Sequence, residues 1–304
     1  MKNSFLSIVI CILAIQVSWL RANDPSPEQL AAEHLKSIAS AEVLSQIKSI
    51  SFVGTTEINF ILGMSGNLSG TAAFLSQGPQ TAMIMKFQDI NYPEEYYAYD
   101  GRTVTVASIK PGFKAPLAEF IYRYDKIMKN GILGGVYSNA WPLLNVKGNR
   151  ATMNLRKTKV DGKELFEMEY RPRDNHGDMK IRLFFDPETY RHVRTEYKVQ
   201  TKEDVTVGPG LEFDDEIGMM GGRGQGSMAG MAIGAVRGES YYTLTEKFGD
   251  FKKVGEVTLP HSYELDYMID GSNQSGFIAN WKINVLEAGF NVPSIDQNLF
   301  KANR

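Results

Sequence analysis

The sequence predicts a mainly β (α+β) fold, in which a strongly curved antiparallel sheet surrounds two helices. Three observations support this prediction. The segment 165–200 alternates apolar and charged residues in three runs that are separated by two turns. Similar runs lie between residues 50 and 108, between 151 and 157, and between 241 and 286. Only the segments 26–47 and 115–130 carry a clear stripe of apolar residues at helical spacing.

The segment 165–200 is predicted to form a meander with one apolar and one charged face. Its turns are expected at 172–177, which is rich in Pro, Asp, Asn and Gly, and at 186–189, where Pro187 suits the second turn position. The apolar face consists of Phe166, Met168, Tyr170, Met179, Ile181, Leu183, Phe185, Val193, Thr195, Tyr197 and Val199. The charged face consists of Glu167, Glu169, Lys180, Arg182, His192, Arg194, Glu196 and Lys198. The rest of the chain must cover the apolar face.

The N-terminus has the features of a cleaved secretory signal peptide. Lys2 precedes an apolar run from Phe5 to Leu20, and Ala22 is a small residue that suits a cleavage site, so residues 1–22 are expected to be removed. The alternative is an uncleaved anchor, although the run is shorter than the roughly 20 residues that a membrane span needs. The only cysteine, Cys11, lies in this run. We therefore expect a periplasmic protein whose stability comes from its core and not from disulfides.

Composition and charge narrow the range of partners. A hydrophobic content of 43% permits a large core and excludes global disorder. Without residues 1–22 the chain has 31 basic and 35 acidic residues, a net charge near −4. This balance argues against nucleic acid or an anionic lipid surface as the main partner.

Two amphipathic helices are predicted. The first begins after Ser26, which can form a capping box with Gln29, and continues to about Ile47. His34 lies on its apolar stripe, where a hydrogen-bonded core histidine is more common than a metal ligand. The second helix covers 115–130 and ends at Gly131. Its apolar face consists of Leu117, Phe120, Ile121, Tyr124, Ile127 and Met128.

A glycine-rich segment separates the meander from the last strands. Its glycine content is too high for a helix or strand, so we predict a disordered loop at about 208–238. Four methionines in this loop provide either an adaptable apolar surface or no particular function. No linker divides the strands into two self-sufficient halves, so residues 23–304 are predicted to form a single domain.

Patterns typical of catalytic sites are mostly absent from the sequence. The four histidines lack metal-ligand spacing, no Ser lies in a G-x-S-x-G motif, and the glycine-rich segment contains no phosphate-binding fingerprint. The acidic runs Glu94–Glu95 and 214–216 are expected on solvated turns and loops. We therefore expect no enzymatic activity, no catalytic residues, no cofactor and no metal site.

The abundant apolar faces are the main positive feature of the sequence. A curved sheet around helices encloses either a filled core or a cavity for an apolar ligand, and the sequence leaves both open. Methionine and aromatic side chains adapt well to an acyl chain. The predicted cavity walls are Met83, Met85 and Phe87 on one strand, and Phe120, Ile121 and Tyr124 on the mid-chain helix.

The order of elements resembles that of the periplasmic lipoprotein carriers (LolA/LolB-like). Three local phrases are also similar to that family: Tyr97 to Arg102 (YAYDGR), Leu183 to Thr189 (LFFDPET) and Gly255 to Pro260 (GEVTLP). The resemblance covers most of residues 23–304 and implies a half-open β-barrel with helices over an apolar concave face that holds acyl chains. The length of this chain and its glycine-rich segment depart from the family pattern.

The expected function is non-enzymatic binding of lipid or lipidated protein in the cell envelope, which includes lipoprotein sorting between membranes. Acyl chains of a lipid or lipoprotein would be the ligand, and an envelope protein is a further candidate partner. The alternative is a sensor or interaction domain of the same fold that recognises a polypeptide. A monomer is expected.

Overall fold

The computed structural model describes residues 24–173, 179–201, 240–271 and 276–302. These residues form an antiparallel sheet of twelve strands in the order β5-β4-β3-β2-β1-β12-β11-β10-β9-β8-β7-β6. The strands are β1 (Ser49–Leu62), β2 (Gly66–Gln77), β3 (Gln80–Phe87), β4 (Glu94–Tyr99), β5 (Val104–Val106), β6 (Thr152–Val160), β7 (Lys163–Arg171), β8 (Lys180–Phe185), β9 (His192–Thr201), β10 (Ser240–Val254), β11 (Val257–Gly271) and β12 (Phe277–Phe290). The predicted mainly β fold is confirmed.

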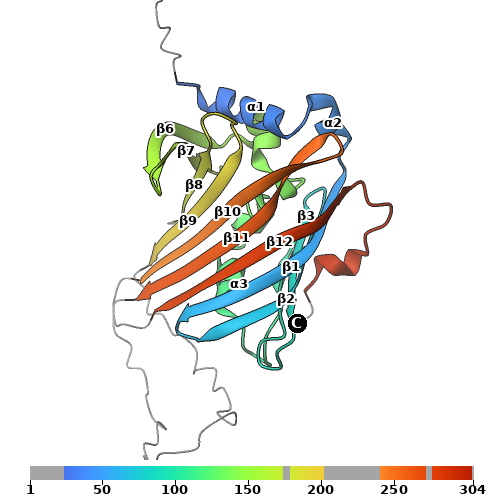
Figure 1. Cartoon of the computed structure of the whole chain (residues 1–304), viewed down its shortest axis with the longest axis vertical. Coiled ribbons are helices and arrows are strands. Elements are labelled where there is room, and N and C mark those ends of the chain that lie inside the picture. Colours follow the sequence, from blue (N-terminus) through green and yellow to red (C-terminus); the bar gives the residue numbers. More distant parts are fainter. Residues whose placement is uncertain (1–23, 174–178, 202–239, 272–275, 303–304) are drawn as a thin grey trace, which may run out of the picture.

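The sheet consists of two meanders that meet where β1 pairs with β12. Every other pair of neighbouring strands is consecutive in the chain. The two edge strands, β5 and β6, are not paired with each other, so the sheet stays open. In Figure 1, β6 and β7 curl away from the long strands β10, β11 and β12, which gives the sheet a concave side. The architecture is therefore a strongly curved sheet, or half-open barrel.

The helices precede β1 or lie between β5 and β6, apart from a short turn near the C-terminus. They are α1 (Pro27–Ile38), α2 (Ala41–Gln46), α3 (Pro116–Arg123), α4 (Lys126–Lys129), η1 (Gly135–Tyr137), η2 (Pro142–Asn145), α5 (Val146–Asn149) and η3 (Gln297–Phe300). Figure 1 shows α1 across one end of the sheet and α3 behind the long strands. Because α3 contacts β4 and β5 while η1 contacts β2 and β9, the helical segment 116–149 spans the concave side. No helix among the described residues is long and apolar enough to cross a membrane.

Both predicted helices exist, but each is interrupted. The capping box of α1 is confirmed, with the Gln29 N–H donating to Ser26 Oγ over 3.2 Å and the Ser26 N–H donating to Gln29 Oε1 over 2.8 Å. The predicted continuation to Ile47 is wrong, because α1 ends at Ile38 and Ser40 caps a separate helix, α2. A serine at this position competes for backbone hydrogen bonds and favours a new N-terminus. The mid-chain helix likewise breaks after Arg123.

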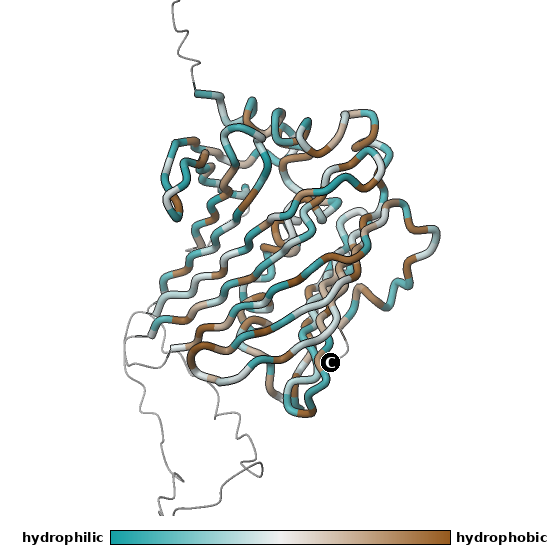
Figure 2. Tube along the Cα trace, viewed as in Figure 1, coloured by the Kyte–Doolittle hydropathy of each residue, from teal (hydrophilic) through white to brown (hydrophobic). Residues whose placement is uncertain are grey.

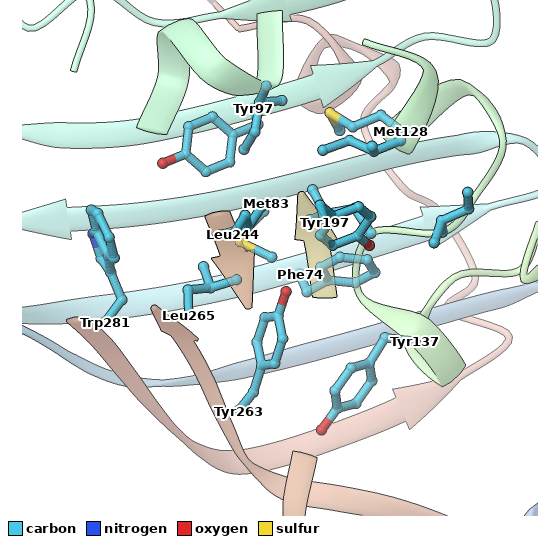
Figure 3. Close-up of a cluster of buried hydrophobic side chains, with 14 of the residues drawn as sticks. Phe74, Met83, Tyr97, Met128, Tyr137, Tyr197, Leu244, Tyr263, Leu265 and Trp281 are labelled. Carbon is cyan, nitrogen blue, oxygen red and sulfur yellow. The ribbon is translucent and has the colours of Figure 1, made fainter. Parts of the chain in front are cut away.

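The apolar core fills the concave side of the sheet. Alternation of apolar and polar residues along the strands is visible in Figure 2 as alternating brown and teal segments. Inward side chains of neighbouring strands face each other, as in the pairs Phe52–Phe74 and Phe74–Met83. Figure 3 shows part of this cluster, in which Tyr197 and Trp281 are fully buried. Such burial of large side chains is the main favourable term for folding.

The predicted meander is confirmed, with one correction at His192. The sequence places His192 on the charged face, whereas it is buried at 1% exposure in the interior. A shift of register between Phe184 and Phe185 pairs Phe184 with Arg194 but Phe185 with His192, so Val193 is the extra residue of a bulge. An insertion of one residue moves the side chains before it to the other face.

Several predictions concern residues outside the described ranges. These are the signal peptide at 1–22, the glycine-rich loop at 208–238, the acidic run 214–216 and most of the turn at 172–177. The prediction that 23–304 forms a single domain also stays a prediction.

Candidate functional site

A charged groove lies on the outer face of the sheet, across β6 to β9. Its volume is about 490 Å³, and it is lined by Asn154, Leu155, Arg156, Glu167, Glu169, Arg171, Lys180, Arg182 and Lys198. Five of these residues are basic and two are acidic, so the groove is basic in a chain whose net charge is −2. A basic groove favours an anionic ligand.

The register of the strands brings these charges together. Arg156 on β6 pairs with Glu167 on β7, and Glu169 pairs with Arg182 on β8. Arg182 in turn pairs with Glu196 on β9. Residues directly opposite in antiparallel strands have their side chains in contact range. Several acidic and basic side chains therefore lie opposite each other on neighbouring strands.

Arg182 lies at the centre of the groove. Its Nη1 is 3.8 Å from Glu167 Oε1, and its Nη2 contacts Glu196 Oε2. Glu167 also accepts from Arg156 Nη2 over 2.6 Å, and the side chains of the two carboxylates are only 4% and 7% exposed. The Arg182 and Arg194 guanidinium groups lie 5.8 Å and 5.9 Å from the Phe184 ring, which holds them in place.

The electrostatic environment of Glu196 illustrates the strength of this network. Burial alone would raise the pKa of Glu196, but the charges of Arg182 and Arg194 outweigh burial and hold its pKa below the ordinary value. Arg194 donates to Glu196 Oε1 from Nε over 3.0 Å. Glu196 is therefore ionised near neutral pH and anchors the two arginines.

Lys180 and Lys198 are the least compensated charges of the groove. They lie directly opposite each other on β8 and β9. Like charges at such positions destabilise the sheet. Lys198 Nζ is 3.6 Å from Glu196, which already contacts two arginines, and no ion pair of Lys180 is present among the described residues. An anionic ligand between the two lysines would relieve their repulsion.

The predicted cavity residues lie in the packed core. Met83, Met85 and Phe87 are buried on β3, and Phe120 and Ile121 are buried on α3. Tyr124, which follows α3, is half-buried, and its ring lies 4.9 Å from that of Phe120. The Phe120 ring also lies 5.2 Å from Tyr267 and 6.3 Å from Tyr242. None of these six residues lines the charged groove or the small apolar pocket below, so ligand binding by them stays a prediction.

A small apolar pocket lies elsewhere, between α2, η2 and the ends of β1 and β11. Its volume is about 40 Å³, and Trp141, Ile50 and Leu259 are among its lining residues. Ligand pockets usually measure about 300–1,000 Å³. This pocket is therefore too small for an acyl chain in the conformation described.

Two carboxylates that sequence reasoning did not select are fully buried on the concave side. Glu246 on β10 accepts hydrogen bonds from the hydroxyls of Tyr197 and Tyr263, each over 2.6 Å, and from the N–H of Gly134 over 2.7 Å. Burial raises the pKa of Glu246 to about 7, against the opposing effect of these hydrogen bonds. The Gly134 contact attaches the helical segment 116–149 to the sheet.

Glu95 on β4 is the second buried carboxylate. It accepts hydrogen bonds from the hydroxyls of Tyr92 and Tyr97, and burial raises its pKa to about 7. The expectation that Glu95 is solvated is wrong, because its exposure is 1%. Glu95 lies on the same face of β4 as Tyr97, and this face points inward. Its two hydrogen bonds from tyrosine hydroxyls offset the cost of burying the carboxyl group.

The histidine prediction on the first helix is confirmed. His34 is buried, its Nδ1 lies 3.1 Å from the carbonyl oxygen of Tyr190, and Trp141 Nε1 donates to its Nε2 over 3.4 Å. Burial lowers the pKa of His34 to about 4. His34 is thus a neutral core residue that connects α1 to the sheet near neutral pH. No group of three or more potential metal ligands occurs among the described residues.

Comparisons with known proteins give only a distant likeness. No protein-family model and no curated protein matches the sequence. Two solved structures are similar, a MucA/MucB complex of Pseudomonas aeruginosa at 12% identity and a complex of MucB with MucA(peri) at 10% identity. Each match covers 86% of this chain and 99% of the other, with a TM-score of 0.21. At that score the backbones superpose poorly, so the resemblance to the lipoprotein carriers stays a prediction.

Proposed function

We propose that this chain is a non-enzymatic binding protein that recognises an acidic polypeptide through the charged groove of β6 to β9. The observation that carries the proposal is the pair Lys180 and Lys198, which face each other across β8 and β9 without sufficient compensation. A cross-strand pair of like charges reduces stability, so its presence in a groove favours a binding role. The partner would supply carboxylates at this point.

The shape of the groove favours a polypeptide over a single small anion. The groove crosses four strands, and neighbouring strands are about 4.8 Å apart, so its basic groups are spread over more than about 14 Å. Arg156 lies at one side and Lys198 at the other. Several carboxylates on one chain can meet these groups at once, whereas one small anion cannot. Glu167 and Glu196 hold the arginines in position beneath.

The experiment uses a fluorescein-labelled oligoglutamate peptide, with oligoglutamine of equal length as the reference. At low salt, fluorescence anisotropy should detect binding of the first peptide only, and added salt should weaken it. The double variant K180Q/K198Q should bind about tenfold more weakly, which corresponds to about 1.4 kcal/mol. The same variant should be slightly more stable in urea than the unchanged protein, because the repulsion is gone.

The matched control is K282Q, which removes an exposed lysine from the outer face of β12, away from the groove. It should leave the affinity for oligoglutamate unchanged. The proposal is wrong if the unchanged protein does not bind oligoglutamate at low salt, or if K282Q weakens binding as much as the double variant.

The proposed location is the periplasm of the cell envelope, and the support is the signal peptide that the sequence predicts at residues 1–22. Osmotic-shock fractionation followed by N-terminal sequencing tests it. Mature protein that starts near Asn23 in the periplasmic fraction is expected. Retention of Met1 with the protein in the membrane pellet would refute it.

A second candidate function is the binding of an acyl chain on the concave side. One observation favours it: the helical segment 116–149 covers the apolar concave side of the sheet with buried apolar side chains, among them Phe120 and Ile121. Displacement of this segment would expose Met83, Met85 and Phe87. Native mass spectrometry of protein purified without detergent tests this candidate, because a co-purified lipid is expected if it is correct. Protein free of lipid that also fails to take up a fluorescent fatty acid would refute it.

A further inference from the structure

We propose that the free edge of β6 accepts an extended acidic segment of polypeptide as an additional antiparallel or parallel strand. This inference rests on the proposed function, since it names how the acidic partner of the charged groove is held. Addition of a strand to a sheet edge uses main-chain hydrogen bonds for affinity and alternate side chains for specificity. Three observations on β6 carry the inference.

The first observation is that β6 is a long edge strand that no second strand pairs with among the described residues, although α1 contacts it. It spans nine residues, all exposed or half-buried. Among the described residues, its only backbone pairing is with β7. Such an edge presents a row of unpaired N–H and C=O groups.

The opposite edge of the sheet differs. β5 has only three residues, and the C-terminal segment packs beside it. The N–H of Ala302 donates to Thr105 Oγ1 over 2.9 Å, and the Tyr96 hydroxyl donates to the carbonyl of Leu299 over 2.7 Å. Phe300 is fully buried there. Among the described residues, the C-terminal segment thus covers the β5 edge, whereas the backbone of β6 has no partner on its free side.

The second observation is the register of the β6–β7 hairpin. This register determines which N–H and C=O groups of β6 are not hydrogen-bonded to β7. Asp161 and Gly162 both have positive φ, 52° and 81°, as in a two-residue turn that matches the twist of a hairpin. The flanking pair, Val160 and Lys163, is then hydrogen-bonded, and so is every second pair from there. The intervening residues direct their N–H and C=O groups outward. These residues are Met153, Leu155, Lys157 and Lys159.

The third observation is the charge around this edge. Arg156 projects into the groove on the outer face with 66% exposure, while Lys157 and Lys159 lie on the alternate positions. The Asp24 carboxylate already contacts Lys157 Nζ. A carboxylate therefore fits at this edge. An added strand with an acidic side chain at every second position would place its carboxylates beside Arg156 and the groove.

Lysine on an edge strand also has a purely protective use, because it opposes pairing with another sheet. The experiment separates the two roles by changing the backbone of the partner without changing its side chains. The probe is a labelled peptide of the length of β6 that alternates Glu and Thr. Two derivatives carry N-methyl groups on all Glu or on all Thr residues.

In an added strand, alternate N–H groups face the edge and solvent. One of the two N-methylated peptides should therefore bind at least about tenfold more weakly, because it loses several main-chain hydrogen bonds. The other should bind within about twofold of the parent peptide, since its methyl groups face water. This asymmetry is specific to strand addition.

A pair of protein variants provides the reciprocal test. Proline is tolerated at an edge position whose N–H faces outward, so K157P should fold and should bind the parent peptide more weakly than K157Q. K157Q removes the same charge and keeps the N–H. Circular dichroism of K157P verifies the fold.

Each result has a distinct meaning. Equal binding of both methylated peptides, or an equal loss in both, overturns strand addition. Equal binding to K157P and K157Q does the same. If these results occur while K180Q/K198Q still weakens binding about tenfold, the groove remains the binding site and only the strand inference fails. If oligoglutamate binds but the parent peptide does not, the strand inference alone fails. If neither binds, the proposed function fails as well.

Discussion

Replacing Glu246 by glutamine should make the protein more stable at alkaline pH while changing little near pH 5. The carboxyl group is buried, and burial raises its pKa from an ordinary 4.5 to about 7. A carboxyl group with a raised pKa in the folded state contributes stability below its unfolded pKa, and this contribution is lost as the pH rises through the folded pKa. The relevant window is therefore about pH 4.5 to 7.

The magnitude follows from the shift. One pKa unit corresponds to about 1.4 kcal/mol, so the full shift amounts to about 3 kcal/mol. Most of this, about 2–3 kcal/mol, is lost between pH 5 and pH 8 by linkage. Glutamine cannot ionise, and its carbonyl oxygen can accept the hydrogen bonds of the Tyr263 hydroxyl and the Gly134 N–H. The stability of E246Q relative to the unchanged protein should thus increase by about 2–3 kcal/mol between pH 5 and pH 8.

Urea unfolding at both pH values measures this difference, because the free energy of unfolding is extrapolated to water in each case. The control is E57Q, which removes an exposed carboxyl group from β1. It should change stability by less than about 0.5 kcal/mol at either pH. A stability difference between E246Q and the unchanged protein that is the same at pH 5 and pH 8 would contradict the reasoning.

The remaining predictions concern the packing of the helical segment. Phe120→Ala should reduce the free energy of unfolding by roughly 3–5 kcal/mol, because the ring is buried among aromatic side chains, whereas Tyr122→Ala on the exposed side of α3 should change it by less than about 1 kcal/mol. A small loss for Phe120→Ala would mean that the ring lines a collapsible cavity. Gly134→Ala should lower stability by about 2–4 kcal/mol, since φ is +84° and the new Cβ would lie 2.7 Å from a buried ring. Gly112→Ala is its control, with φ of +80° and open space, and should lower stability by only about 1 kcal/mol. Urea unfolding measures all four, and equal effects for the two glycine variants would refute the packing argument.

The strands were predictable because period-two alternation is a local property. The segment around Phe166, Met168 and Tyr170 alternates without interruption, and so do the residues around Trp281. Turn residues marked the boundaries, as at Asp161–Gly162. Helix interruptions were harder to predict, since Ser40 can lie within a helix or cap a new one, and packing decides between these states.

The buried polar residues were not predictable from the sequence, because their burial depends on distant partners. Glu246 is acceptable in the core only because Tyr197 and Tyr263 reach it from neighbouring strands. His192 points inward because of a β-bulge, and no local sequence pattern predicts this bulge. Long-range pairing therefore determined which polar residues lie inside.

The charged groove, on the outer face of the sheet, was also not predictable from the sequence, because it too depends on long-range pairing. Alternation alone assigned Lys180 and Arg182 to a charged face, but only the register decides that Lys180 faces Lys198 while Arg182 faces Glu196. A register shifted by two residues would have placed Lys180 opposite Glu196, and the two lysines would no longer face each other. The free edge of β6 likewise depends on the strand order, since a closed barrel would have paired it with β5. The proposed binding thus depends on two global properties of the sheet, its register and its open edge, that no single segment encodes.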